Sequence, residues 1–350
     1  MQFEEQKAYN ALAYLSGGNY HPLKKYREQF SSWASAWEDA SKTAPIDIDE
    51  AWNELDKNHI QLILCDDPRF PSLLREIPWP PFGLYFKGAI PSEEPSIAIV
   101  GTRKASALGK RIAHQFAREL ARTKIPVISG LAFGIDAEAH RGVVAERGRT
   151  IAVLANGLET VYPREHARLA AQILELDGTL ISEYPAFTAS LPSRFIERNR
   201  IISGLSKGVI VIEAPKKSGS LATARFAIEQ NRDVFVVPGA IDNLNYRGSH
   251  ELIKSGAMLI TDTTDVLHGL DLASFAAEVK QKERQKELEL LNAAEQTIVS
   301  TLTLQGKKLT AEQIIEHTNL SPSEIQRALA FLVIKQYIQE EHGVYSLKLI

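Results

Sequence analysis

The chain has 350 residues, of which 44% are hydrophobic and 24% are charged, so it can bury a sizeable core and form two or three domains. Its net charge of −3 hides an uneven distribution: residues 1–94 carry −6, residues 95–265 carry +5, and residues 266–350 carry −2. One cysteine, Cys65, excludes an internal disulfide and favours a reducing compartment. The polar start and the lack of a long apolar stretch predict a cytoplasmic protein without a membrane partner.

The N-terminal part, residues 1–64, has a helical pattern and no cluster of ligand-like side chains. Three prolines and two aromatic residues in segment 77–83 exclude a helix interior there and predict a buttress against the following domain. Residues 88–95 are expected to be a linker. We therefore predict an N-terminal helical region over residues 1–64 and assign it no DNA role.

From residue 96 to residue 262 the chain alternates short apolar runs with longer helical patterns. The apolar runs are residues 97–100, 126–129, 150–155, 179–183, 208–214, 233–239 and 258–261. Because these runs are apolar throughout, their strands should be buried on both faces, as in a parallel sheet. The pattern predicts a doubly wound, mostly parallel α/β domain which, with the buttress segment, covers residues 65–270. The order of the strands is left open.

Residues 271–292 carry balanced charges and predict a helical spacer, followed by a small module over residues 293–350. Two capped helices, a third helix and a terminal hairpin make the winged-helix pattern. The third predicted helix offers Arg327 and Lys335 against Glu324, and the hairpin is acidic. A groove-reading helix would be cationic, so we expect this module to contact protein rather than bind duplex DNA strongly.

In a doubly wound sheet, the loops that leave the carboxyl ends of the strands form the ligand crevice. Backbone N–H groups at the start of a helix, aided by hydroxyl groups, bind anions. The candidate phosphate-cradling residues are Gly101, Thr102, Ser106, Gly109, Gly130, Gly134, Ser218, Gly219 and Ser220. Taken alone, each of these loops is explained better as a tight turn between a strand and a helix than as an anion site. The sequence contains neither a P-loop motif nor a dinucleotide-binding fingerprint. Several such loops, with cations at three of them, favour a phosphate-rich partner.

Cationic residues gather near the same loops. The candidate ligands for that partner are Arg103, Lys104, Lys110, Arg164, Arg194, Arg198, Asn199, Arg200, Lys216 and Lys217. Arg198 falls on the apolar helix face of Phe195 and Ile202, where an arginine must be paired or must reach an anion. A structural salt bridge explains Arg198 alone equally well. Arg200 should project elsewhere, toward solvent.

Catalytic groups do not assemble in the sequence, and no metal-ligand spacing is present, so we predict a non-enzymatic protein without cofactor. Glu183 and Glu213 end strands at the crevice rim, where they can pair with the arginines or act as a base. Aromatic residues near the crevice can stack on bases, although core packing is their commoner fate. These residues are Phe133, Tyr162, Tyr184 and Phe187.

Several long motifs occur in a characteristic order, among them IAIVGTR, VISGLAFGIDAEAH, TIAVLANGLETVYP, RNRIISGLS and VIVIEAPKKSGSLATA. Over residues 66–262 the chain resembles the DNA-processing protein A family (DprA, also called Smf), and residues 295–348 resemble the winged-helix tail of many members. Position by position, the family's DNA pocket would include Arg103, Arg164, Arg198 and Arg200. Ile196 stands where the family usually has a proline, so the turn there is expected to differ.

The resemblance implies an extended Rossmann-type fold and a homodimer formed through that domain. It also implies binding and protection of single-stranded DNA and loading of the RecA recombinase, in natural transformation or related homologous recombination. An alternative is a nucleotide-processing enzyme of a related fold that hydrolyses nucleoside monophosphates, although the loop SGSLATA lacks the glutamate such enzymes carry. A transcriptional regulator acting through the winged helix is the weakest alternative.

Overall fold

The computed structural model describes residues 2–44, 46–90 and 94–347, so the predicted linker over residues 88–95 lies partly outside the described residues. The chain divides into two compact units, Met1–Ala276 and Ala277–Ile350. Helix α13 (Ala273–Glu289) contains the division between the units. Within the described residues, no helix is long and apolar enough to cross a membrane.

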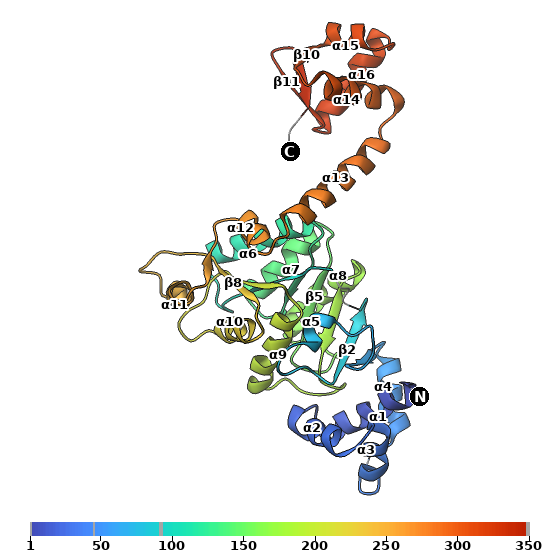
Figure 1. Ribbon diagram of the computed structural model, residues 1–350, viewed down its shortest axis with the longest axis vertical. Helices are drawn as coiled ribbons and strands as arrows, with labels where there is room; N and C mark the ends of the chain where they lie inside the picture. The colour runs from blue at the N-terminus through green and yellow to red at the C-terminus, as the bar shows by residue number, and fades with distance from the viewer. Residues whose placement is uncertain (1, 45, 91–93, 348–350) are drawn as a thin grey trace. The chain divides into compact units, whose positions relative to one another are not determined.

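The first unit is built on a nine-stranded sheet in the order β1-β2-β6-β5-β4-β3-β7-β8-β9 (Figure 1). The strands are β1 (Gln61–Leu64), β2 (Gly83–Gly88), β3 (Ile97–Val100), β4 (Val127–Ser129), β5 (Thr150–Val153), β6 (Thr179–Ser182), β7 (Gly208–Val211), β8 (Asp233–Val236) and β9 (Met258–Leu259). Strands β3 to β9 are parallel to their neighbours, and β1 and β2 extend the sheet antiparallel beyond β6. The predicted mostly parallel α/β sheet is confirmed, and its strands β3 to β7 are buried along their whole length as the uninterrupted apolar runs require.

Helices cover both faces of this sheet (Figure 1). The helices of this part are α5 (Ser72–Arg75), α6 (Ala107–Arg122), α7 (Ile135–Ala145), α8 (Ala167–Glu175), α9 (Pro192–Gly204), α10 (Ser220–Glu229), α11 (Arg247–Lys254) and α12 (Thr263–Gly269), with short 3-10 turns at Arg164–His166 and Leu244–Tyr246. Helices α6, α7 and α12 share one core with the sheet, whereas α9 and α10 share another. Pro192 occupies the start of α9, where its missing N–H costs nothing.

Four N-terminal helices precede the sheet: α1 (Gln2–Leu15), α2 (Tyr20–Gln29), α3 (Trp33–Ala40) and α4 (Ile48–Lys57). Their core, with Tyr9, Leu12 and Trp33 almost fully buried, is continuous with residues of α8 and of β6. The Tyr85 hydroxyl of β2 donates to the side-chain oxygen of Asn10 at 2.9 Å inside this core. The helices therefore pack as part of the first unit.

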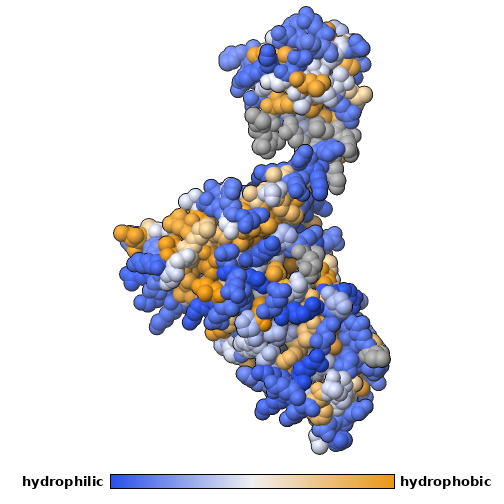
Figure 2. Space-filling view, in the orientation of Figure 1, coloured by the Kyte–Doolittle hydropathy of each residue, from blue (hydrophilic) through white to orange (hydrophobic). Residues whose placement is uncertain are grey.

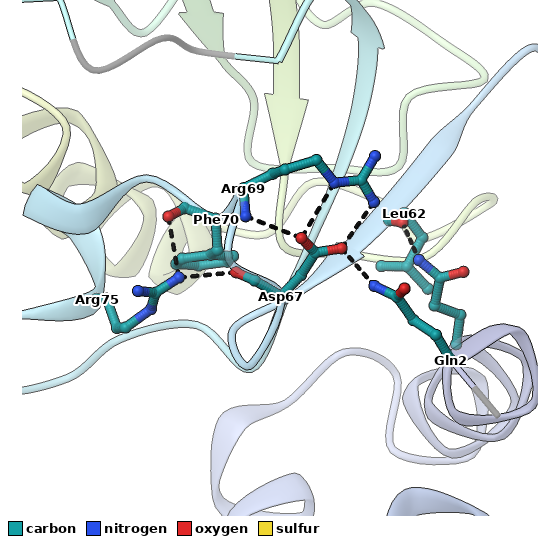
Figure 3. Close-up of polar contacts among 7 residues, drawn as sticks. Gln2, Leu62, Asp67, Arg69, Phe70 and Arg75 are labelled. Atoms are coloured by element: carbon teal, nitrogen blue, oxygen red, sulfur yellow. Dashed lines mark hydrogen bonds and ion pairs between the residues drawn. The ribbon is translucent and has the colours of Figure 1, made fainter.

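A polar network around Asp67 links α1 to the segment that follows β1 (Figure 3). The Asp67 carboxylate accepts hydrogen bonds from the Arg69 side chain at 2.7 and 3.1 Å and from Gln2 Nε2 at 2.5 Å. These Arg69 bonds, opposed by partial burial, lower the pKa of Asp67 to about 2. The Arg75 guanidinium donates to the carbonyls of Cys65, Asp67 and Phe70 and so closes the turn around the network.

Beyond the end of α13, the described residues of the second unit form three helices and a three-stranded antiparallel sheet in the order β10-β12-β11. Its elements are α14 (Ala293–Gln305), β10 (Leu309–Thr310), α15 (Ala311–His317), α16 (Pro322–Ile334), β11 (Ile338–Glu341) and β12 (Val344–Leu347). Asn292, Thr310 and Ser321 form capping boxes at the starts of the three helices. Ile298, Ile314 and Leu332 are fully buried in a core that belongs to this unit alone.

Candidate functional site

The topology places a crevice between β3 and β7. These two strands are parallel neighbours, but after β3 the chain continues through α6 to β4 on one side, and after β7 it continues through α10 to β8 on the other. The loops diverge at this switch point and leave a ligand crevice at the carboxyl ends of the strands. A cleft of about 520 Å³ lies there, lined by the loops after β3 and β7 and by α9.

The cleft brings together a subset of the predicted phosphate ligands. The predicted residues that line it are Gly101, Thr102, Arg103, Lys104, Arg198, Asn199, Lys217, Ser218, Gly219 and Ser220. Arg103, Lys104 and Lys217 are exposed at its rim. Arg198, which is only 3% exposed, forms part of its floor. Cationic groups at both levels make the cleft suitable for an anion.

The N-terminus of α10 opens into the cleft. A Cβ atom added to Gly219 would meet no atom within 4 Å, so there is free space above the helix start. The Asn199 side-chain amide donates to the Gly219 carbonyl at 3.2 Å, and the hydroxyls of Ser218 and Ser220 lie 2.7 Å apart. The first backbone N–H groups of α10 donate to Ser218 and Gly219 in the preceding loop. The positive end of the helix dipole, the two hydroxyls and the open space above them therefore favour a phosphate at this point.

Arg103 is stacked beside this anion site. Its guanidinium carbon lies 4.7 Å from the centroid of the Phe195 ring, and the Tyr162 ring lies 5.5 Å from the same ring. A guanidinium on an aromatic face stays available to phosphate oxygens while the rings remain available to bases. The sequence analysis did not predict that Phe195 lines the cleft, although its position on one helix face with Arg198 was a signal. Tyr184, a predicted stacking residue, is 1% exposed and cannot reach a base.

Arg198 is held at the floor of the cleft by backbone carbonyls. Its Nη1 donates to the Gly130 carbonyl at 2.9 Å and to the Val153 carbonyl, while its Nε has no partner among the described residues. Burial lowers the pKa of Arg198 to about 10. Burial also raises the pKa of the nearby Asp136 carboxyl, although the positive charge of Arg198 acts to lower it. A Cβ on Gly130 would lie 2.5 Å from Arg198 Nη2 and 2.8 Å from Asp136 Oδ2. The predicted phosphate role of Gly130 is therefore corrected: it makes room for Arg198.

Gly134 is corrected in the same way. It has a φ of +80°, and a Cβ there would collide with the Thr102 carbonyl oxygen. The glycine lets the loop after β4 pack against the backbone of Thr102 and Arg103, so it supports the cleft without lining it.

Arg194 and Arg200 are structural residues, contrary to the prediction that both bind DNA. The Arg200 guanidinium is 1% exposed and donates to both oxygens of Glu183 at 2.7 and 2.6 Å, and its Nε donates to the Trp79 carbonyl at 3.0 Å. Arg194 donates to the Gly17 carbonyl at 2.8 Å and lies 4.9 Å from the Tyr184 ring. Both side chains bind the segments that precede the parallel sheet, so neither is free for an external phosphate.

Ser106 and Gly109 do not cradle a phosphate, because an internal carboxylate already occupies the N-terminus of α6. Glu213 Oε2 accepts hydrogen bonds from the Ser106 backbone N–H at 3.0 Å and from its hydroxyl at 3.1 Å. Asn245 Nδ2 donates to the other Glu213 oxygen at 2.6 Å. A Cβ on Gly109 would collide with the Glu213 carboxylate, so only glycine fits there. Glu213 thus holds the start of α6, and its hydrogen-bond partners are Ser106 and Asn245 instead of the arginines that the sequence suggested as partners.

Three further predicted cations lie outside the cleft lining. Lys110 lines a separate groove on α6 together with Arg111, His114 and Arg118. Lys216 forms an exposed ion pair with Glu251 at 3.4 Å, and Arg164 is exposed in the turn after β5. Of the five arginines predicted as ligands, Arg103 is therefore the one that both lines the cleft and is exposed. Among the described residues, no three His, Cys, Asp or Glu side chains are grouped as metal ligands.

Comparison with known proteins identifies relatives that share this architecture. The family described as DNA recombination-mediator protein A matches residues 61–271. Protein Smf of Escherichia coli is 44% identical over 226 residues, which cover 64% of this chain and 60% of that protein, so the match spans less than two thirds of the relative. Protein Smf of Synechocystis is 38% identical over 318 residues, covering 81% and 79% of the two chains.

Two solved structures are similar as well. The X-ray structure of DNA processing protein A from Streptococcus pneumoniae has a TM-score of 0.61 at 34% identity and covers 74% of this chain and 86% of that one. A structure of the Helicobacter pylori protein, titled for its single-stranded DNA binding mode, has a TM-score of 0.54 at 28% identity and covers 61% and 97% of the two chains. By its motifs, its sheet and these relatives, the chain belongs to the DNA recombination-mediator protein A family, whose members are named DprA or Smf.

Proposed function

We propose that this protein binds single-stranded DNA in the cleft between β3 and β7. The observation that carries the proposal is the pairing of an open α10 N-terminus with Arg103, which is stacked on Phe195 at 4.7 Å. The first feature suits a phosphate and the second suits a phosphate next to an unpaired base. The structure of the Helicobacter pylori relative, which describes a single-stranded DNA binding mode, supports single-stranded DNA as the ligand.

The wider role that we propose is cytoplasmic protection of incoming strands and loading of the RecA recombinase during natural transformation or homologous recombination. Membership of the family supports this role. We propose a non-catalytic protein because the carboxylate that lines the cleft, Asp136, accepts a hydrogen bond from the Gly130 N–H at 3.2 Å and lies beside the Arg198 guanidinium. A carboxylate held in this way is a structural anchor for Arg198 rather than a free base.

We propose that the second unit is a winged helix, with β11 and β12 as the wing and α16 as the recognition helix. We propose that it contacts a protein, because Phe331 and Ile334 near the end of α16 are 39% and 77% exposed and the first turn of the helix carries the acidic residue Glu324. An apolar and partly acidic surface disfavours the phosphates of duplex DNA.

The experiment that tests the DNA-binding proposal compares single-stranded and duplex oligonucleotides of one sequence, titrated with salt. We expect tighter binding of the single strand, an affinity that falls as salt rises, and little dependence on base sequence. In the same preparation, added protein should shorten the delay before RecA assembles on the single strand. Equal affinity for duplex, or release of free base from nucleoside monophosphates, would count against the proposal.

We also propose that the first unit forms a homodimer through an apolar edge patch made of Ile241, Leu244, Met258 and Leu259. These side chains are 90%, 60%, 48% and 48% exposed, and Figure 2 shows hydrophobic residues gathered over this part of the molecule, near α11 and β8. Strand β9 ends the sheet at this side, and sheet edges with exposed apolar side chains tend to be covered. A second copy of the chain is the occupant that family membership favours.

Replacing Ile241 with aspartate should therefore convert a dimer into a monomer, because a charge at a side chain that is 90% exposed harms only a covered surface. Sedimentation analysis at micromolar concentration measures this change. The matched control is Leu108→Asp, at a leucine of α6 that is 51% exposed, which should leave the mass unchanged. An Ile241→Asp protein with the mass of the dimer would exclude the patch.

A further inference from the structure

Three large aromatic side chains lie exposed on successive loops beside the cleft. Phe133 follows β4, Tyr162 follows β5 and Phe187 follows β6, and these strands are parallel neighbours in the sheet. Their exposed fractions are 44%, 47% and 60%. We refer to these three side chains as the aromatic row. Burying the exposed apolar surface of each ring would be energetically favourable, and exposed apolar surface of this kind marks binding sites.

Two of the rings are held in place by neighbours instead of being free to fold inward. The Phe133 ring packs edge-on against His166 with centroids 4.9 Å apart, and His166 is itself buried with Nδ1 2.8 Å from the Leu131 carbonyl oxygen. Tyr162 packs against Phe195, the ring on which Arg103 is stacked. These contacts cover part of each ring, and the rest of each side chain stays exposed.

Phe187 is held exposed at a cost in backbone energy. Its φ is +60°, in the left-handed region that bulky residues rarely adopt. The loop around it is braced, because the Gly157 N–H donates to the Thr188 carbonyl at 2.9 Å and a Cβ on Gly157 would lie 2.6 Å from the Pro185 carbonyl oxygen. Strain of this kind persists where the surroundings impose it, and such positions cluster at ligand sites.

The aromatic row is continuous with the cleft. Ala132, Tyr162 and Ser190 line the cleft, and they come from the same three loops that carry the row. Arg164 is exposed two residues after Tyr162 and adds a cation beside the rings. Aromatic faces flanked by cations favour a polynucleotide over an apolar protein surface.

We propose that the aromatic row is a base-stacking track that leads away from the phosphate-binding cleft along the carboxyl edge of β4, β5 and β6. This inference rests on the proposed binding of single-stranded DNA and adds the part of the ligand that each region contacts. The cleft binds phosphate and responds to salt, whereas the row binds bases through their ring faces and responds little to salt. Duplex DNA cannot use the row, because its bases are stacked on one another.

The test compares oligothymidylate with an abasic oligonucleotide of equal length, which keeps the phosphates and lacks the bases. The wild-type protein should bind oligothymidylate more tightly than the abasic strand. The double variant Phe133→Ala/Phe187→Ala should lose about 25-fold or more in affinity for oligothymidylate, since each of the two base–aromatic contacts is worth about fivefold or more. Its affinity for the abasic strand should stay within twofold of wild type, because the phosphate contacts of the cleft and the base contacts of the aromatic row contribute independently to binding.

Two further variants keep the test decisive. Ile228→Ala removes an equally exposed side chain, 56% accessible, from the last turn of α10, at the opposite end from the cleft, and should bind both strands as the wild type does. Phe133→Tyr/Phe187→Tyr retains the rings and should keep the preference for oligothymidylate, which separates loss of stacking from loss of folding. Equal binding of the two strands by the wild type, or an unchanged double alanine variant, overturns the track while leaving the cleft intact. Failure of the wild type to bind either strand overturns the proposed function itself.

Discussion

Replacing Glu183 with glutamine is expected to lower the free energy of unfolding of the first unit by about 3–5 kcal/mol, the usual cost of breaking a buried ion pair. Arg200 is 1% exposed and Glu183 is 6% exposed, and two hydrogen bonds of 2.7 and 2.6 Å join them. The variant leaves the guanidinium charge buried without its counter-ion. The same guanidinium lies 4.4 Å from the Trp79 ring, so its displacement should also loosen the proline-rich segment.

Intrinsic tryptophan fluorescence during urea denaturation measures this effect selectively. All four tryptophans, Trp33, Trp37, Trp52 and Trp79, belong to the first unit, so the signal does not report the second. Asp39→Asn is the matched control, because the Lys42–Asp39 pair is exposed, with 72% and 59% of the two side chains accessible. Exposed pairs contribute at most about 1 kcal/mol, so this variant should unfold close to the wild-type midpoint. Equal midpoints for the two variants would show that the buried pair does not stabilise the fold.

The second large effect is expected for DNA binding. Arg103→Ala should weaken single-strand affinity about tenfold, because it removes the proposed charge-assisted phosphate contact and the guanidinium stacked on Phe195. The dependence of the logarithm of affinity on the logarithm of salt should become shallower by about 0.7 for a lost contact to a single strand. Arg103→Lys should recover part of the affinity, because the charge remains while the planar stacking group is lost.

Neighbouring lysines provide the control for general surface charge. Lys217 lines the cleft, whereas Lys216 is paired with Glu251 at 3.4 Å outside it. Lys217→Ala should therefore weaken single-strand binding severalfold more than Lys216→Ala, although both remove one positive charge. Fluorescence anisotropy with a labelled oligonucleotide at several salt concentrations measures both quantities. Equal losses of affinity in the two lysine variants would mean that DNA binds through the overall surface charge and not in this cleft.

The arginines around Asn199 show how far sequence reasoning can reach. Arg198 lies on an apolar helix face, and from this position alone its burial and need for a partner were predictable. Its partners, the carbonyls of Gly130 and Val153, lie 68 and 45 residues away in the chain, so no local pattern announces them. Arg200 was expected to be solvated, and this was wrong because Glu183 and Trp79 close over it.

The glycine loops also show which features the sequence predicts and which depend on the tertiary structure. Their placement at the carboxyl ends of strands follows from the order of apolar runs and helices. Which helix starts can meet a ligand depends on Glu213, which reaches the start of α6 across 107 residues and occupies it, whereas the start of α10 lines the cleft. The sequence alone determined the parallel sheet, its crevice and the family, because local residue patterns show which segments are buried and where the chain turns. Only the tertiary structure decided which cations face solvent, because an ion pair or a helix cap is made by groups that the fold brings together from distant parts of the chain.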